Sequence, residues 1–222
     1  VYEGAYTYRG MHIVPGWGGS MFEELMPAVF VPEEDWAPRS WGVNHPLHVR
    51  AEREHGVDEA NYGFWGFSPS SNPAGGYREY GVDALGMNPD GYFSDQEKTN
   101  LDLGFGECRK ATKRNPVYRT GVVTPHASFL AMMFERDSAV ANLVRIEKVL
   151  KAYGEGGFFD AVEVDGRIAR RYLSLDQAMV MGALGNVLAS DVLRRAFSTS
   201  DVESALRPVI GIEEFGAGLV AG

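Results

Sequence analysis

Residues 124–150 read TPHASFLAMMFERDSAVANLVRIEKVL, and this segment indicates the fold class most directly. Thr124-Pro125 is a typical helix start, so we expect a first helix from there to about Glu135. Asp137 is placed to cap a second helix, which Gly154 ends. The apolar positions of this second helix recur at helical spacing, at Val140, Leu143, Val144 and Leu150. Two consecutive helices of this kind predict a mainly α-helical chain.

The rest of the chain adds further predicted helices and little strand. Start and stop signals place helices at 20–26, 46–55, 174–189, 191–197 and 201–207. Pro46 lies at a first-turn position of its helix, which stops at Gly56, and the last helix ends before Pro208. Asp165-Gly166 is a tight-turn signal and predicts a short β-hairpin within 158–173. Helices therefore dominate, with short strands beside the loops.

The composition is that of a globular domain and limits the classes of function. The chain has 222 residues, with 21 Lys plus Arg against 30 Asp plus Glu, so its formal net charge is -9. This balance argues against binding nucleic acid or an anionic membrane surface by bulk charge. No apolar run approaches the ~18 residues of a membrane span. The single cysteine, Cys108, cannot form an intrachain disulfide and has no neighbouring histidine in the sequence, so we do not expect a thiol nucleophile.

A long loop-rich segment, residues 57–121, separates the two groups of predicted helices. It is too long for an ordinary connection, and its aromatic residues argue against disorder. Across the chain, 27 glycines and an aromatic content of 12% are typical of a sugar site, where rings stack on sugar faces and glycine allows close approach. The alternative is a loop-rich structure with its aromatics in the core, and composition alone favours that alternative.

The sequence GWGGSMFEELMP at 16–27 is the densest motif in the chain. It places Trp17 and Glu23 near the N-terminus of a short helix that Pro27 ends. The helix N-terminus lowers the pKa of a carboxyl group, whereas burial beside a tryptophan raises it. Glu23 is thus a candidate functional carboxylate. The alternative is structural, because Ser20 and Glu23 have the spacing of a capping box.

The long loop holds a second cluster, in which WGFSPSSNP at 65–73 is followed by GGYREYG at 75–81. Aromatic and hydroxyl side chains surround the pair Arg78-Glu79. A glycosidase needs two carboxylates on either side of the scissile bond, together with aromatic walls. Glu79 is the best second carboxylate in the sequence. The alternative is a salt bridge, with Arg78 or with another charge of the loop.

Two helix starts carry further polar side chains. Asp176 and Gln177 lie in the first turn of the predicted helix at 174–189, where they could bind sugar hydroxyls or simply serve the helix start. His126 lies just after Thr124-Pro125, which favours its neutral form. It could donate to a hydroxyl, act in proton transfer or be a structural histidine.

One helix carries a weak metal-binding pattern. His48, Glu52 and His55 fall at i, i+4 and i+7 on a single face. They lack the tight His-Glu-x-x-His form, and charged helix faces are usually solvated. We therefore predict no metal site and no cofactor.

Five motifs follow one another in a specific order: GWGGSMFEELMP at 16–27, WGFS at 65–68, YGV at 80–82, GVVTPHA at 121–127 and SLDQ at 174–177. With them the chain resembles the glucoamylase-like family over roughly residues 6–197. That family includes bacterial β-1,2-glucanases and is related to the transglycosylase domain of cyclic β-1,2-glucan synthases. The resemblance implies an (α/α)6 toroid with a sugar cleft built from its loops.

The resemblance also implies how the chain divides. Residues 1–222 form a single partial-toroid domain, the C-terminal half, with residues 57–121 as long cleft loops and a small β-hairpin. The N-terminal helices are then missing or belong to another chain. Because members of the family are largely exported, we expect an extracytoplasmic or secreted protein.

The resemblance assigns roles to individual residues. Glu23 matches the glutamate of the family's Met-Phe-Glu motif and is the expected general acid, with Glu79 as base or second carboxylate. The residues expected to line the cleft are Trp17, Trp65, Tyr77, Arg78 and Tyr80, and those expected to bind hydroxyls are His126, Asp176 and Gln177. The chain departs from the β-1,2-glucanase branch in the insert 88–119 and in the Gly18-Gly19 turn, which leaves the linkage open.

The expected function is therefore a glycoside hydrolase that acts on an oligo- or polysaccharide such as a glucan. One alternative is a polysaccharide lyase with Tyr80 and His126 as acid and base, although an anionic uronate polymer would suit a basic groove. The other alternative is a non-catalytic carbohydrate-binding half-domain, or one that needs a partner chain.

Overall fold

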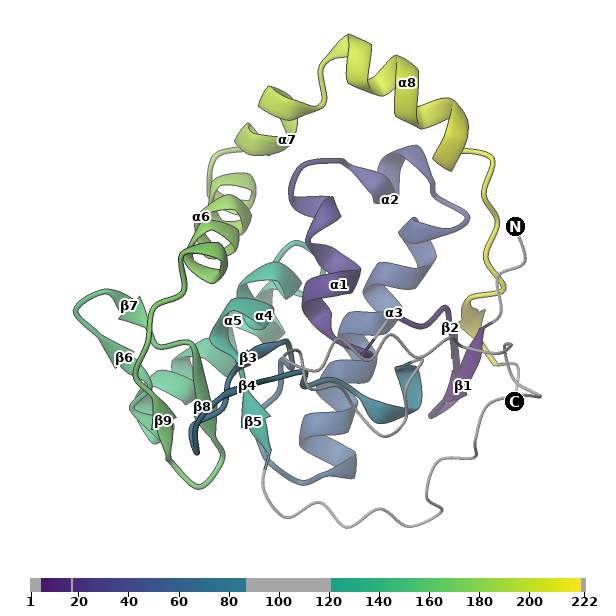
Figure 1. Cartoon of the computed structure of the whole chain (residues 1–222). Helices are drawn as coiled ribbons and strands as arrows, with labels where there is room; N and C mark the ends of the chain where they lie inside the picture. Colours follow the sequence, from purple (N-terminus) through teal and green to yellow (C-terminus); the bar gives the residue numbers. More distant parts are fainter. Residues whose placement is uncertain (1–4, 17, 87–120, 221–222) are drawn as a thin grey trace.

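The two ends of the described chain meet in one small sheet. The structure is a computed structural model that describes residues 5–16, 18–86 and 121–220. Strand β1 (Tyr6–Tyr8) pairs with β2 (Met11–Ile13), and β2 pairs with β10 (Gly218–Leu219), in both cases antiparallel. Figure 1 shows this sheet where the chain begins and ends. The insert at 88–119 and Cys108 lie outside the described residues.

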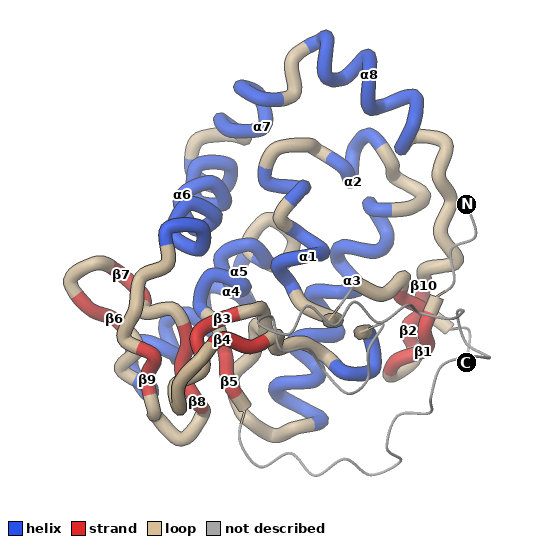
Figure 2. The backbone as a smooth tube through the Cα atoms, viewed as in Figure 1, coloured by secondary structure: helices blue, strands red, loops and turns tan. Residues whose placement is uncertain are grey.

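Helices are the main secondary structure of the described chain and make up about half of it, as a mainly α-helical prediction requires. The helices are α1 (Met21–Leu25), α2 (Glu33–Trp36), α3 (Trp41–Glu54), α4 (Pro125–Ala131), α5 (Arg136–Arg145), α6 (Ser174–Leu188), α7 (Val192–Phe197) and α8 (Ser200–Ile210). Short 3-10 turns span Pro27–Val29 and Asp83–Leu85, and π-helical turns at His55–Glu59 and Ile146–Leu150 extend α3 and α5. In Figures 1 and 2, α6, α7 and α8 follow one another in an arc around α1 and α2. Over the described ranges, none of the helices has the length and apolar character needed to cross a membrane.

The core lies between α1, α3 and α4. Helix α1 packs against both α3 and α4, and α4 packs in turn against α5 and α6. Apolar side chains from all of these helices join one buried cluster. The loop residues Phe64, Trp65 and Phe67 are buried in the same cluster. These loop aromatics therefore stabilise the core, at about 2 kcal/mol for each buried side chain.

Helix α3 differs from its predicted form at both ends. It begins at Trp41, so Pro46 lies inside the helix instead of in its first turn, and the chain continues past Gly56 as a π-helical turn. A proline inside a helix removes one backbone hydrogen bond and costs about 3 kcal/mol. Polar side chains that α3 buries offset this cost through hydrogen bonds, since Asn44 and His45 both bond to Glu24. The sequence signals are local, and they were overridden by packing.

Two smaller boundary predictions are also corrected. Pro208 lies inside α8 and does not end it. Asp137 lies in the first turn of α5, and the residue that precedes this helix is Glu135. Both corrections move a boundary by a few residues and leave the predicted helix in place.

Short strands gather at one end of the helices, in red at the lower left of Figure 2. Strands β3 (Ser70–Ser71) and β4 (Tyr77–Arg78) form one hairpin, and β6 (Tyr153–Gly154) and β7 (Gly157–Phe158) form another. A three-stranded sheet has the order β5 (Val122–Val123), β8 (Ala161–Glu163) and β9 (Ile168–Ala169). The pair β8–β9 confirms the predicted hairpin. Because β5 leads into α4 and β9 leads into α6, the first turns of these two helices lie at the same end.

Candidate functional site

Two glycine-rich segments, residues 16–19 and 81–86, lie against each other beside α1. β-Bridges join the segments, and the Val82 N–H donates to the carbonyl of Gly19 at 2.9 Å. Gly19 has a φ of +67°, and a Cβ there would collide with the carbonyl oxygen of Val82. Only glycine allows this approach. The contact brings Glu79, which shortly precedes the second segment, to the N-terminal end of α1.

Glu23 and Glu79 both contact Gly18. The N–H of Gly18 donates to Oε2 of Glu23 at 2.9 Å. A Cβ on Gly18 would lie 2.5 Å from Cγ of Glu79, so the Glu79 side chain occupies the space that any larger residue would need. Ser20 makes no side-chain cap hydrogen bond to α1, so the capping box considered as the alternative for Glu23 does not form.

The surroundings of Glu79 favour its protonated form. Burial raises the pKa of Glu79 to about 8, and the negative charge of Glu23 adds to the rise. Its Oε1 is buried without a hydrogen-bond partner among the described residues. The charge that acts on the pKa of Glu79 is therefore the negative charge of Glu23, and a hydrogen bond with Ser20 opposes the rise. A carboxyl group with this pKa is mostly protonated at neutral pH, whereas Glu23 accepts a hydrogen bond as a carboxylate would.

The aromatic residues expected to line a cleft lie in different environments. Tyr77 and Arg78 form β4 and are exposed, and Tyr80 is half-buried against the core. Trp65 is only 3% exposed and belongs to the core, which corrects its expected place on a cleft wall. Its backbone is held by the Asn142 side chain, which accepts from the Trp65 N–H and donates to its carbonyl. Trp17 lies outside the described residues.

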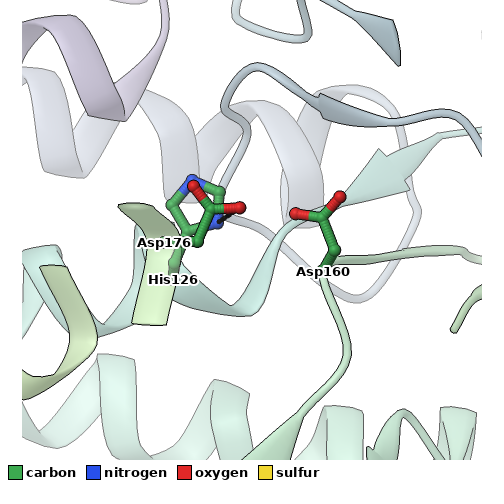
Figure 3. Close-up of side chains that lie close together, drawn as sticks. All are labelled: His126, Asp160 and Asp176. Carbon is green, nitrogen blue, oxygen red and sulfur yellow. Dashed lines mark ion pairs between the residues drawn. The ribbon is translucent and has the colours of Figure 1, made fainter. Parts of the chain in front are cut away.

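A second cluster of acidic side chains brings three elements together at the end of the helices where the short strands lie. His126 comes from the first turn of α4, Asp176 from the first turn of α6, and Asp160 from the link between β7 and β8. Each is at most 3% exposed, and one ligand atom from each lies within 4.8 Å of the others. Figure 3 shows the Asp176 carboxylate beside the His126 ring, with the Asp160 carboxylate turned toward them.

Burial controls the protonation of this group. Burial lowers the pKa of His126 to about 4, although the charge of Asp160 opposes the shift. The imidazole is therefore neutral at pH 7, as the sequence predicts, but because of burial and not because of the helix start alone. Burial, followed by the nearby carboxyl group of Asp160, raises the pKa of Asp176 to about 8. Burial and then the charges of Asp176, Asp160 and Glu79 raise the pKa of Tyr77, which places this side chain near both acidic groups.

Asp160 is the site residue that sequence reasoning missed. It follows Phe158-Phe159 in a segment with no motif, and no local signal marks it. Its position depends on the pairing of β8 with β5 and on the Ser71 N–H, which donates to its Oδ2 at 2.7 Å. Gln177, which was expected to bind a hydroxyl, donates from Nε2 to the Phe158 carbonyl at 3.3 Å and so ties the start of α6 to β7.

The weak metal pattern on α3 has another role. His48 and Glu52 are fully buried, which corrects the expectation of a solvated face. Glu52 accepts a hydrogen bond from the Phe67 N–H at 2.7 Å, and Nδ1 of His55 lies 2.7 Å from Glu59. In the described part of the chain, these side chains do not converge on a common point as metal ligands would.

These observations define a helix-rich protein with two groups of acidic side chains at the loop end of its helices. The model of the family described as "Glycoamylase: Putative glucoamylase" matches residues 2–201. The chain therefore belongs to the glucoamylase-like family.

Three relatives illustrate the similarity. The chain is 29% identical over 201 residues to the cyclic beta-(1,2)-glucan synthase NdvB of Rhizobium meliloti, covering 85% of this chain and 6% of the synthase. The solved structure of the beta-1,2-glucanase from Parabacteroides distasonis matches with a TM-score of 0.67 at 16% identity, covering 95% of this chain and 27% of that one. The endo-beta-1,2-glucanase from Chitinophaga pinensis, solved with sophorotriose and glucose, gives 0.63 at 18% identity, covering 91% and 44%. The chain thus shares their fold and spans less than half of each of these proteins.

Proposed function

We propose that the chain belongs to an enzyme that cleaves glycosidic bonds of a glucan, with Glu23 and Glu79 as its pair of carboxyl groups. The observation that carries the proposal is their shared contact with Gly18, next to a Glu79 whose pKa is raised to about 8. Acid–base cleavage of a glycosidic bond needs one protonated and one ionised carboxyl group at the same time. When one carboxyl group of a close pair is ionised, its charge opposes ionisation of the other, so the pair holds one protonated and one ionised group at neutral pH.

The roles within the pair can be assigned in two ways. The family resemblance gives the general acid to Glu23 and the base to Glu79. In the free protein, the raised pKa favours Glu79 as the protonated member and the Gly18 N–H favours an ionised Glu23. Protons of such a pair belong to both groups jointly, so the free-protein state does not by itself fix which group donates in the reaction.

A leaving-group experiment separates these assignments. Glu23→Gln and Glu79→Gln would each be made in the full-length protein and tested on polymeric glucans and on an aryl glycoside with an activated leaving group. Both variants should lose turnover on the polymer by about two orders of magnitude or more. The variant that lacks the acid should keep its turnover on the aryl glycoside, because that leaving group needs no proton. Unchanged polymer turnover in both variants would refute the proposal.

The substrate proposed first is a β-1,2-linked glucan. The similarity to the cyclic beta-(1,2)-glucan synthase NdvB and to the two beta-1,2-glucanases supports this choice, as does the sophorotriose bound to the Chitinophaga enzyme. A panel of β-1,2-, β-1,3-, β-1,4- and α-linked glucans, read by released reducing ends, tests it. Cleavage of another linkage alone would retain the carboxylate pair and reject the β-1,2 assignment.

We also propose that the chain forms part of an (α/α)6 toroid completed by further helices, in an extracytoplasmic protein. Large apolar side chains on the outer arc support the first point, because such residues would be covered in a closed ring: Met181, Leu188, Val209 and Ile212 are each more than 60% exposed. Light scattering of this chain, alone and with the rest of the protein, tests it. Fractionation of the producing cells tests the location.

The lyase alternative is less well supported. It needs a tyrosine that can lose or share its proton near neutral pH. Burial raises the pKa of Tyr80, and burial with three nearby acidic residues raises the pKa of Tyr77. Products that absorb in the ultraviolet band of unsaturated uronates would nevertheless reinstate it. The non-catalytic alternative would gain support if the protein bound glucans of the panel but cleaved none of them.

A further inference from the structure

His126, Asp160 and Asp176 lack the partners that buried polar groups normally have. Both ring nitrogens of His126, Oδ1 of Asp160 and Oδ2 of Asp176 are buried without a hydrogen-bond partner among the described residues. More than 90% of buried polar groups in folded proteins find such a partner. Four unpaired atoms within one small group therefore indicate that a further species completes it.

We propose that His126, Asp160 and Asp176 bind a divalent transition-metal cation, of the kind represented by Zn²⁺ or Mn²⁺. The donor set is one imidazole nitrogen and two carboxylate oxygens. Imidazole favours Zn²⁺ and related ions over Mg²⁺ and Ca²⁺, and Mn²⁺ accepts both imidazole and carboxylate. These three residues include neither Glu23 nor Glu79, and the inference does not depend on the proposed glucan cleavage.

The spacing suits ligands of one ion better than a direct hydrogen bond. Nδ1 of His126 lies 3.7 Å from Oδ2 of Asp176, beyond the 2.7–3.2 Å range of a hydrogen bond. Two ligands held about 2.1 Å from a tetrahedral ion lie about 3.4 Å apart. The atoms of all three residues lie within 4.8 Å of one another, so side-chain rotations that shorten these separations by up to about 1.4 Å would bring them onto one centre. In Figure 3 the space between the facing carboxylates is where such an ion would lie.

The charge of the group also calls for a cation. Within the described residues, neither Asp160 nor Asp176 has an arginine or lysine as ion-pair partner, and His126 is the one base that faces them. Two adjacent buried carboxyl groups are costly to ionise together without a cation, and the usual solutions are pairing or metal coordination. A divalent ion neutralises both groups at once.

The surroundings provide a second layer of support for ligation. The Ser71 N–H donates to Oδ2 of Asp160 at 2.7 Å, which fixes that carboxylate and leaves its Oδ1 for an ion. Metal-ligating carboxylates are commonly oriented by such hydrogen bonds. An ion here would join the first turns of α4 and α6 to the link before β8 and, through Ser71, to the β3–β4 hairpin. Glu79 directly follows that hairpin, so the ion would also stiffen the segment that carries Glu79.

The test is a metal titration of the purified, untagged chain. After chelator treatment and dialysis, isothermal titration with ZnCl₂ and with MnCl₂ should each be run, together with thermal unfolding. We expect one Zn²⁺ or Mn²⁺ per chain and a higher Tm with the bound ion. Asp160→Asn and His126→Gln should each weaken the affinity at least tenfold, since loss even of a supporting hydrogen bond costs ten- to a hundredfold.

Asp165→Asn is the matched control. Asp165 is an exposed aspartate in the turn between β8 and β9, on the same hairpin as Asp160, and its variant should bind the ion as the wild type does. If Asp160→Asn does not fold, Asp176→Asn serves as the second variant, with Co²⁺ absorption as a direct readout of lost ligation. Binding of neither ion by the folded wild type, binding of Ca²⁺ alone, or equal affinity in the ligand variants and the control would each overturn the proposal.

Discussion

Two groups of the same composition, one buried histidine with two carboxyl groups, are in opposite electrostatic states. In the first group, His45 of α3 lies between Glu24 and Glu33, with Nδ1 2.8 Å from Glu24 and Nε2 3.2 Å from Glu33. In the second, neither nitrogen of His126 has a hydrogen-bond partner among the described residues. Both rings are almost fully buried, so burial is not what separates them.

The difference is in the hydrogen bonds. Burial lowers the pKa of both rings, and it takes the pKa of His126 to about 4. At His45 the hydrogen bonds and charges of Glu24 and Glu33 outweigh burial and raise the pKa to about 9. The first group is a completed ion network that stabilises the fold. The second is incomplete, and incomplete buried polar groups are where binding or chemistry is expected.

The largest effect expected from this contrast is on stability. His45→Gln removes the cation between two carboxylates, one of them fully buried, and should lower the free energy of unfolding by about 3–5 kcal/mol. His126→Gln breaks no hydrogen bond and, in chelator, should cost about 1 kcal/mol or less. Urea unfolding at pH 7, followed by circular dichroism, measures both. Equal losses would show that the two groups contribute alike and would remove the contrast.

A second effect is the pH dependence of stability, which should differ between the groups. The pKa of His45 is raised from 6.5 to about 9, so its stabilising contribution is fully present below about pH 6.5 and is lost as pH rises through 9. The pKa of Asp176 is raised from 3.8 to about 8, so the folded state holds that proton more tightly. Its contribution is fully present below about pH 4 and is lost as pH rises through 8. For His45, a pKa shift of this size corresponds to a loss of about 3 kcal/mol.

Two variants separate these windows. Asp176→Asn should flatten the decline between pH 4 and 8, and His45→Gln should flatten the decline between pH 6.5 and 9. The measurement is the midpoint of urea unfolding across this pH range, in chelator so that no bound ion contributes. A wild-type stability that rises from pH 4 to 8, or an unchanged profile in Asp176→Asn, would contradict the assignment.

The sequence predicts some of these features and not others, for physical reasons. The helix at 174–189 and the hairpin around Asp165-Gly166 are set by local turn and start signals, and the structure confirms both. Pro46 gave a wrong helix start because buried contacts of α3 outweigh the cost of a proline inside it. Long-range contacts decide the rest.

The candidate site follows the same division. Glu23 could be selected from its sequence motif. That Glu23 and Glu79 contact the same glycine could not be predicted, because it depends on two glycine-rich segments some 60 residues apart meeting beside α1. Asp160 has no motif and joins His126 and Asp176 only through strand pairing. Trp65 shows the opposite error, because a tryptophan in a glycine-rich loop was expected at a surface and lies in the core.

The smallest effect is expected when one of the two carboxylates beside His45 is removed, which makes the His45 group more like the His126 group. Glu33 lies 3.2 Å from His45, and its side chain is 13% exposed, so it contributes less than the buried Glu24. Glu33→Gln should lower the pKa of His45 by about one unit, which corresponds to about 1.4 kcal/mol. Asp35→Asn, an exposed change in the same helix α2, is the matched control. A titration of the ring nitrogens by NMR gives the pKa directly, and an unchanged value in Glu33→Gln would mean that Glu24 alone keeps His45 charged. A pKa that instead falls below 6.5 would mean that one hydrogen-bonded carboxylate is too little to offset burial, which is the state of His126 with neither nitrogen bonded.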